Sequence, residues 1–289
     1  MSRPPVSNAT PVRLGDPQVS ALLALLHDHR DRELQAELRR QLGALDGATL
    51  ARLAQAARAA PDHVAMAVEA AREQRQWREL ETELLALRVR RGGLEDLLLL
   101  LTRFAHADAA PATTRAQLDA LAAHCRGRLE PLADASVLAV QLGQVLGGEL
   151  RFAGNAADYY SPENSFLDAV LATRRGVPLS LSCLYLLVAW RLGLPLRGIG
   201  LPGHFIVGLP RRAGDWVYLD PFHHGRVVTE PDCARLVQQQ GHRFEQRHLA
   251  PVDASYIFLR TLANLYQAYE RLEDWRRADV VLHYGRLWG

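Results

Sequence analysis

The chain has 289 residues, of which 48% are hydrophobic and 23% are charged, and its formal net charge is +2. This composition is typical of a globular protein that buries its core in one large domain or in two to three small ones. The near balance of charge, without an arginine-rich tract interleaved with aromatic residues, argues against nucleic acid as a partner.

The three cysteines, Cys125, Cys183 and Cys233, are scattered along the chain without C-x-x-C spacing. This distribution argues against a disulfide framework and against a zinc site. We therefore expect neither a bound metal nor a cofactor.

Residues 1–16 are polar and rich in proline, and we expect them to be disordered. They lack the apolar core of a signal peptide. The most apolar stretches further along, "LEDLLLLLTRF" and "LSLSCLYLLVAWRLGLPL", are too short or too interrupted to cross a bilayer, which takes ~20 apolar residues. We accordingly expect a cytoplasmic protein without a membrane partner.

Residues 17–92 are predicted to be helical. Apolar residues recur every three or four positions in "VSALLALLHD", "ELQAELRRQLGAL" and "ATLARLAQAARAA", and in the long segment that begins at Asp62. Short helices in series favour solenoid-like helical pairs or, equally, a plain helical layer packed on the next domain. Gly92–Gly93 marks the expected boundary to that domain.

Residues 93–247 are predicted to form an α+β domain. A helical pattern extends to about residue 150 and gives way to a polar, aromatic loop over residues 151–165. Two more helices follow, the second from about Pro178 to Leu192, and then four short β-type runs between residues 196 and 229. Helices followed by strands, without βαβ alternation, indicate an antiparallel sheet.

Residues 248–289 return to a helical pattern, with "LED" as a turn between two helices. The pair fits one tetratricopeptide-like hairpin. Because a solenoid needs about three such repeats, a single copy indicates a cap or a docking hairpin.

Four motifs between residues 150 and 235 occur together: "NSFL", "RRGVPLSLS", "GLPGHF" and "LDPF". In combination they resemble the transglutaminase-like superfamily and, within it, the bacterial SirB-type proteins, which join such a domain to tetratricopeptide-like helices. The resemblance implies a papain- or transglutaminase-like core, in which a helix packs on an antiparallel sheet.

The resemblance also implies a catalytic site with one departure from the superfamily pattern. Active members carry a nucleophilic cysteine at the start of the helix that ends here in "RLGLP", and counting back places that position at Pro178. The histidine and the aspartate of the triad fall on His204 and Asp220. SirB-type proteins resemble this chain in having proline there, so the resemblance implies a retained proton-transfer pair without its nucleophile.

Three residues of the same helix are candidate substitutes or contacts. Ser182 lies one turn beyond Pro178 on the same face, about 6 Å deeper. A nucleophile must approach its base to ~2.6–3.2 Å, so Ser182 would require a shift of the helix. Cys183, among leucines, is expected to be a small buried residue. Ser180 faces away from Pro178 and suits local backbone hydrogen bonding.

The favoured function is a non-catalytic binding or regulatory scaffold that holds a protein or peptide partner in the former substrate cleft, near His204, Asp220 and Tyr160. Asn164 and Ser180 are candidate binding residues there, or they only cap helices. The alternative is an amide or peptide hydrolase in which Ser182 or Cys183 is the nucleophile. In that case His204 is the base and Asp220 orients it.

His223 and His224 form a doublet that invites a metal interpretation together with His204. We expect an exposed loop pair instead, because no acidic or thiol ligand is fixed at supporting spacing.

Overall fold

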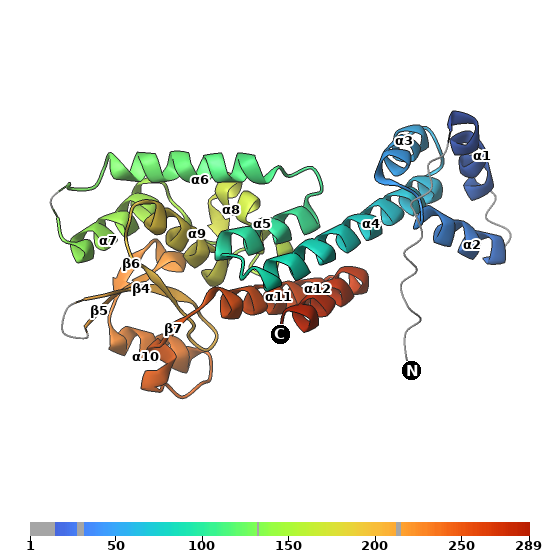
Figure 1. Cartoon of the computed structure of the whole chain (residues 1–289). Coiled ribbons are helices and arrows are strands. Elements are labelled where there is room, and N and C mark those ends of the chain that lie inside the picture. The colour runs from blue at the N-terminus through green and yellow to red at the C-terminus, as the bar shows by residue number, and fades with distance from the viewer. Residues whose placement is uncertain (1–14, 28–31, 132, 212–214) are drawn as a thin grey trace. The chain divides into compact units, whose positions relative to one another are not determined.

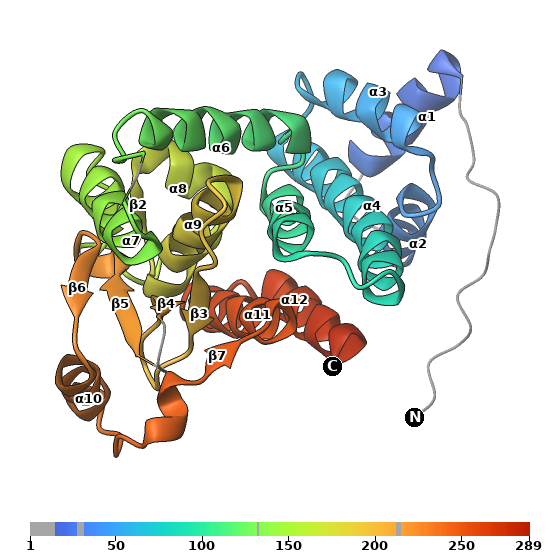
Figure 2. The same ribbon diagram turned by 60° about the vertical axis from the view of Figure 1, so that its left-hand side comes forward.

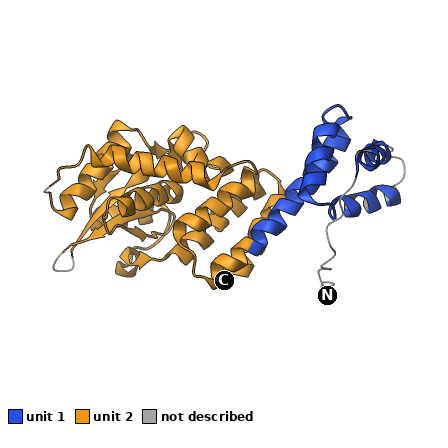
Figure 3. Ribbon diagram, turned by 45° about the horizontal axis from the view of Figure 1, so that its top comes forward, with its two compact units in different colours: residues 1–82 blue, residues 83–289 orange. Residues whose placement is uncertain are grey.

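The computed structural model describes residues 15–27, 32–131, 133–211 and 215–289 (Figure 1). The chain divides into two compact units, residues 1–82 and residues 83–289 (Figure 3). The division lies inside the long helix α4 (Asp62–Val89), ahead of the predicted boundary at Gly92–Gly93. Of the segment expected to be disordered, only residues 15 and 16 are described, and Asp16 begins the first helix.

The first unit is helical, as its apolar spacing predicts. Asp46 caps α3 at its N-terminus, where its carboxylate accepts a hydrogen bond from the Thr49 backbone N–H at 2.6 Å. The core is a cluster of leucines and smaller aliphatic residues from all four helices. The helices are α1 (Asp16–His27), α2 (Arg32–Leu42), α3 (Gly47–Ala57) and the first part of α4.

The second unit combines helices with a sheet, which confirms the predicted α+β class. Short 3-10 turns, η2 (Pro162–Ser165), η4 (Pro221–His223) and η5 (Gln246–Leu249), connect its elements. Its helices, after the end of α4, are α5 (Leu94–Ala105), α6 (Pro111–Arg126), α7 (Ala135–Gly143), α8 (Leu167–Thr173), α9 (Pro178–Arg191), α10 (Glu230–Gln239), α11 (Ala254–Arg271) and α12 (Trp275–Trp288).

The sheet has five antiparallel strands in the order β6-β5-β4-β3-β7 (Figure 2). Four of them coincide with the predicted β-type runs: β3 (Arg197–Ile199), β4 (Ile206–Pro210), β5 (Trp216–Asp220) and β6 (Arg226–Val228). The fifth, β7 (Pro251–Val252), was not predicted. A separate parallel pair joins β1 (Ala153–Gly154) to β2 (Arg175–Gly176).

Helix α9 is the centre of the second unit. All of its residues from Pro178 to Ala189 are buried, which explains why its sequence is apolar on every side. The sheet presents Phe205, Val207 and Leu219 to the cluster around α9. Because side chains alternate along a strand, Ile206 and Tyr218 point to the other face, which α10 covers (Figure 2).

Helix α7 continues directly into a π-helical turn, η1 (Gln144–Glu149). Gly147 in this turn touches the backbone of the turn between β5 and β6, where a Cβ would lie 1.9 Å from the His224 carbonyl oxygen. Only glycine permits that approach. Irregular turns of this kind are frequent near functional sites.

The C-terminal helices are part of the second unit, so the predicted boundary at residue 247 separates no compact units. Residues 251–252 complete the sheet, and α11 contacts α5, α9 and η2. Trp288 packs edge-on against Phe258 at 5.1 Å and donates its indole N–H to Ser255 Oγ at 2.8 Å. Within the described ranges, no helix has the length and apolar character needed to cross a bilayer.

Candidate functional site

His204 and Asp220 meet at one end of the β4–β5 hairpin. The register pairs Val207 of β4 with Leu219 of β5. His204, in the loop before β4, therefore lies beside Asp220, the last residue of β5. His204 Nε2 lies 3.0 Å from Asp220 Oδ1. The two side chains are 8% and 0% exposed, so the pair is shielded from bulk water.

Asp220 has two further partners. His223 Nδ1 lies 2.6 Å from Asp220 Oδ2, and Arg226 Nη2 lies 3.6 Å from the same oxygen. Burial acts to raise the pKa of Asp220, but hydrogen bonds and charge from His204 and His223 outweigh it and hold the pKa below its usual value. An ionised carboxylate only accepts, so both facing imidazole nitrogens carry protons.

Pro178, at the position that the resemblance assigns to the nucleophile, is the first residue of α9 and is buried. Its ring supplies no hydroxyl or thiol. Proline suits this position because the first N–H of a helix has no partner within the helix.

Neither candidate substitute is hydrogen-bonded to the His204 ring. Ser182 is fully buried, and its hydroxyl donates to the Phe205 carbonyl oxygen at 3.3 Å. Cys183 is also buried, and burial raises the pKa of its thiol to about 12. Within the described part of the chain, no hydroxyl or thiol is hydrogen-bonded to either nitrogen of the His204 ring.

Ser180 makes the local backbone contacts predicted for it. Its hydroxyl accepts from the Val177 N–H at 3.2 Å and donates to the Asn164 carbonyl oxygen at 2.5 Å. A Cβ on Gly176 would lie 2.6 Å from the Ser180 hydroxyl, so glycine makes room for this contact. The hydroxyl of Ser180 is therefore satisfied by backbone groups of the fold.

Asn164 organises the aromatic loop in the same way. Its amide nitrogen donates to the carbonyl oxygens of Asp158 and Tyr159 at 2.6 and 3.2 Å. Its side-chain oxygen accepts from Asn155 Nδ2 at 2.9 Å. Asn164 is buried, so it fixes the loop backbone rather than facing solvent.

A row of rings connects this loop to the histidine. Tyr160 contacts Tyr159 edge-on at 5.2 Å between centroids, Tyr159 contacts Phe222 at 6.1 Å, and Phe222 contacts His204 at 6.0 Å. Tyr160 is 49% exposed, and the Arg271 guanidinium lies 3.7 Å from its ring centroid. The predicted site residue Tyr160 thus reaches the His204 pair through two intervening rings.

Arg260 of α11 fixes the backbone of the histidine loop. Its Nη2 donates to the carbonyl oxygens of Leu201 and His204, each at 2.8 Å. Sequence reasoning missed this residue because it lies 56 positions after His204, on a helix assigned to another domain. It also missed Phe222, although "LDPF" contains it.

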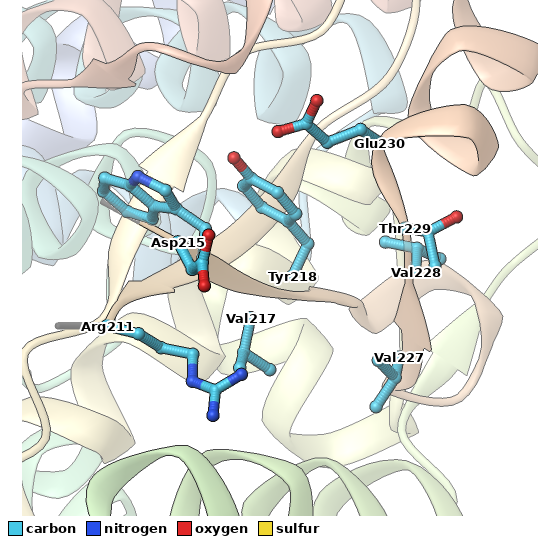
Figure 4. A pocket seen from close by; sticks show the side chains of 9 residues that line it. Arg211, Asp215, Val217, Tyr218, Val227, Val228, Thr229 and Glu230 are labelled. Atoms are coloured by element: carbon cyan, nitrogen blue, oxygen red, sulfur yellow. The ribbon is translucent and has the colours of Figure 1, made fainter. Parts of the chain in front are cut away.

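A separate hollow of about 390 Å³ lies over strands β5 and β6 (Figure 4). Trp216 and Tyr218 stack there with rings 4° from parallel, and the absence of a side chain at Gly208 leaves room for both rings. Burial and the charge of Glu230 raise the pKa of Tyr218 to about 12. The residues that line this hollow include neither His204 nor Asp220.

Comparison with curated proteins finds relatives that match part of the chain. A UPF0162 protein of Xylella fastidiosa (strain Temecula1) is 38% identical over 136 residues, which cover 45% of this chain and 48% of that protein. F-box only protein 21 of Mus musculus is 37% identical over 149 residues, which cover 46% of this chain and 23% of that protein. A UPF0162 protein of Pseudomonas aeruginosa is 32% identical over 182 residues, 61% of this chain and 66% of that protein.

The chain spans about half the length of the Xylella relative and about a quarter of the mouse one. None of the solved structures matches it significantly. The family model described as transglutaminase-like superfamily matches residues 112–263, just over half of the chain. This match includes α9, His204 and Asp220, and it shows that the chain belongs to the transglutaminase-like superfamily.

Proposed function

We propose that the second unit is a non-catalytic transglutaminase-like domain of the SirB type, with α11 and α12 as its tetratricopeptide-like hairpin. The domain would act as a binding or regulatory scaffold that holds a protein or peptide segment. The observation that supports the proposal is the buried Pro178 at the position of the nucleophile, beside a His204–Asp220 pair that is otherwise intact.

The chemistry of the nearby residues supports the same conclusion. A nucleophile must lie within hydrogen-bond reach of its base. The Ser182 hydroxyl is bonded to a backbone carbonyl oxygen, and a thiol with a pKa of about 12 holds almost no thiolate at neutral pH. Neither residue has the access or the ionisation that an acyl transfer requires.

The loop over residues 155–165 is the proposed contact surface. Asn164 holds its backbone from inside, while Tyr159 and Tyr160 expose part of their rings. A rigid loop with exposed tyrosines loses little entropy when a partner docks on it. The region shared with F-box only protein 21 makes up less than a quarter of that protein, which is consistent with a module used inside larger chains.

The competing function is an amide or peptide hydrolase that uses Ser182 or Cys183 with His204 and Asp220. The retained pair favours it, because aspartate on one ring nitrogen holds a histidine in the tautomer that a general base needs. It would require α9 to shift so that one of the two buried groups reaches His204.

Acyl labelling separates the two functions. We expect serine- and thiol-directed acyl probes to leave the folded chain unlabelled, because Ser182 and Cys183 are buried and Cys125 and Cys233 are as well. Labelling is read by intact-protein mass spectrometry, and denatured protein, in which the thiols react, is the reagent control. Labelling of the folded chain that disappears in His204→Ala would instead establish the hydrolase.

Binding is tested by affinity capture with the full chain. A partner that uses the loop is expected to be retained by the wild type and to be lost with Tyr160→Ala, since that ring is the outermost of the aromatic row. Trp275→Ala is the matched control, because Trp275 is a large exposed ring outside the loop. Equal capture by both variants would exclude the loop as the contact surface.

A further inference from the structure

Three potential metal ligands come together at the end of the β4–β5 hairpin. His204, Asp220 and His223 each offer one ligand atom, and these atoms lie within 4.8 Å of one another. The expectation of no metal site rested on the lack of an acidic ligand near the histidines. The fold provides one, because it places Asp220 between the two imidazoles.

The geometry of η4 brings His223 back to Asp220. The Asp220 carboxylate caps this short turn and accepts a hydrogen bond from the His223 backbone N–H at 3.4 Å. This turn places the His223 side chain next to the same carboxylate. The rings of His204 and His223 lie 5.9 Å apart at 40°, with one nitrogen of each directed at Asp220. Phe222 contacts both rings edge-on.

We propose that His204, Asp220 and His223 bind one divalent transition-metal ion of the zinc class. Two imidazole nitrogens and one carboxylate oxygen are a ligand set that zinc, cobalt and nickel accept. Each imidazole would bind the ion as a neutral ring, with its one proton moved to the ring nitrogen that faces away from Asp220, so the ion replaces the two N–H groups that now point at the carboxylate. Three protein ligands leave one position of a tetrahedral site open to water or to a group from a partner.

The surroundings allow the three ligands to close on the ion. Zinc binds nitrogen and oxygen at ~2.0–2.2 Å, so the three ligand atoms must move together. His223 is able to make most of that movement, because its side chain is 44% exposed whereas those of His204 and Asp220 are buried. Arg226 is the nearby cation, and its side chain is 53% exposed and free to turn toward solvent.

The test is zinc binding by the full, tag-free chain, measured by titration calorimetry. His223→Asn removes one ligand, and His224→Asn is the matched control. His224 is the adjacent histidine, its Nδ1 lies near the Gly147 carbonyl oxygen, and its positive φ of 60° is tolerated by asparagine. For the wild type and both variants, we would also measure the visible absorption of bound cobalt and the shift in melting temperature on addition of zinc.

We expect one zinc per chain for the wild type and for His224→Asn. Mutation of a residue that only hydrogen-bonds to a metal ligand already weakens metal binding roughly 10–100-fold. Loss of a ligand itself, in His223→Asn, is therefore expected to weaken zinc binding by at least about 100-fold. Zinc should raise the melting temperature of the first two proteins only. Absence of saturable binding, equal affinity in all three proteins or equal loss in both variants would each overturn the proposal. The metal site does not depend on whether the domain is catalytic.

Discussion

Asp220→Asn is expected to lower the free energy of unfolding by about 3 kcal/mol at pH 7. The carboxylate is fully buried and accepts hydrogen bonds from His204 and His223. The amide keeps the shape, but its NH2 group is a donor and would face a protonated imidazole nitrogen. The amide therefore cannot accept from both rings as the carboxylate does, and one imidazole N–H loses its acceptor. Urea unfolding followed by far-UV circular dichroism measures the difference.

The loss in Asp220→Asn should depend on pH in a defined direction. The folded pKa of Asp220 lies below the unfolded value, so its ionisation stabilises the fold above the unfolded pKa of ~3.9. That contribution disappears as the pH falls through the folded pKa. The two proteins should therefore differ most near neutrality and converge from about pH 4 downward.

An exposed aspartate provides the control for this experiment. Asp119 forms a surface ion pair with Arg191, and its side chain is 68% exposed. Asp119→Asn should cost less than about 1 kcal/mol, because exposed ion pairs contribute little. A loss in Asp220→Asn that stays constant from pH 7 to pH 4 and below would show that its charge does not stabilise the fold.

The strands, the buried helix and the His204–Asp220 pair of this site could be predicted from the sequence, but the remaining contacts could not. Short β-type runs between turns indicated β3, β4, β5 and β6. The resemblance to the transglutaminase-like superfamily assigned His204 and Asp220 to one site, and the antiparallel register of β4 and β5 places them together. The continuous apolar run of α9 predicted that Cys183 is buried, as the structure confirms. The strands and the burial of α9 depend on local periodicity, which a single sequence displays, whereas the site residues were identified from the matching motifs.

Contacts that depend on distant segments were not predictable in this way. Arg260 reaches the His204 loop from a helix that local periodicity assigned to a separate hairpin. His223 was expected to be an exposed loop residue, and it is exposed, but the capping turn at Asp220 returns its ring to the carboxylate. The pair β1–β2 has only two residues per strand, too few to show a period.

Gly147→Ala is expected to lower the free energy of unfolding by about 3 kcal/mol or more. The new Cβ would lie 1.9 Å from the His224 carbonyl oxygen and 2.8 Å from the Gly225 N atom. Both neighbours are backbone atoms, so no side chain can rotate away and the turn itself must move. That turn carries His223, so the same change should also disturb the contact of His223 with Asp220.

Gly148→Ala is the matched control, one residue further along the same π-helical turn. A Cβ there would have no neighbour within 4 Å. Alanine restricts the unfolded chain more than glycine does, so this variant should be neutral or up to about 1 kcal/mol more stable. Urea unfolding of both variants tests the contrast. If the two alanines behaved alike, the close approach of η1 to the β5–β6 turn would not contribute to stability, and the position of His223 would have to be determined by Asp220 alone.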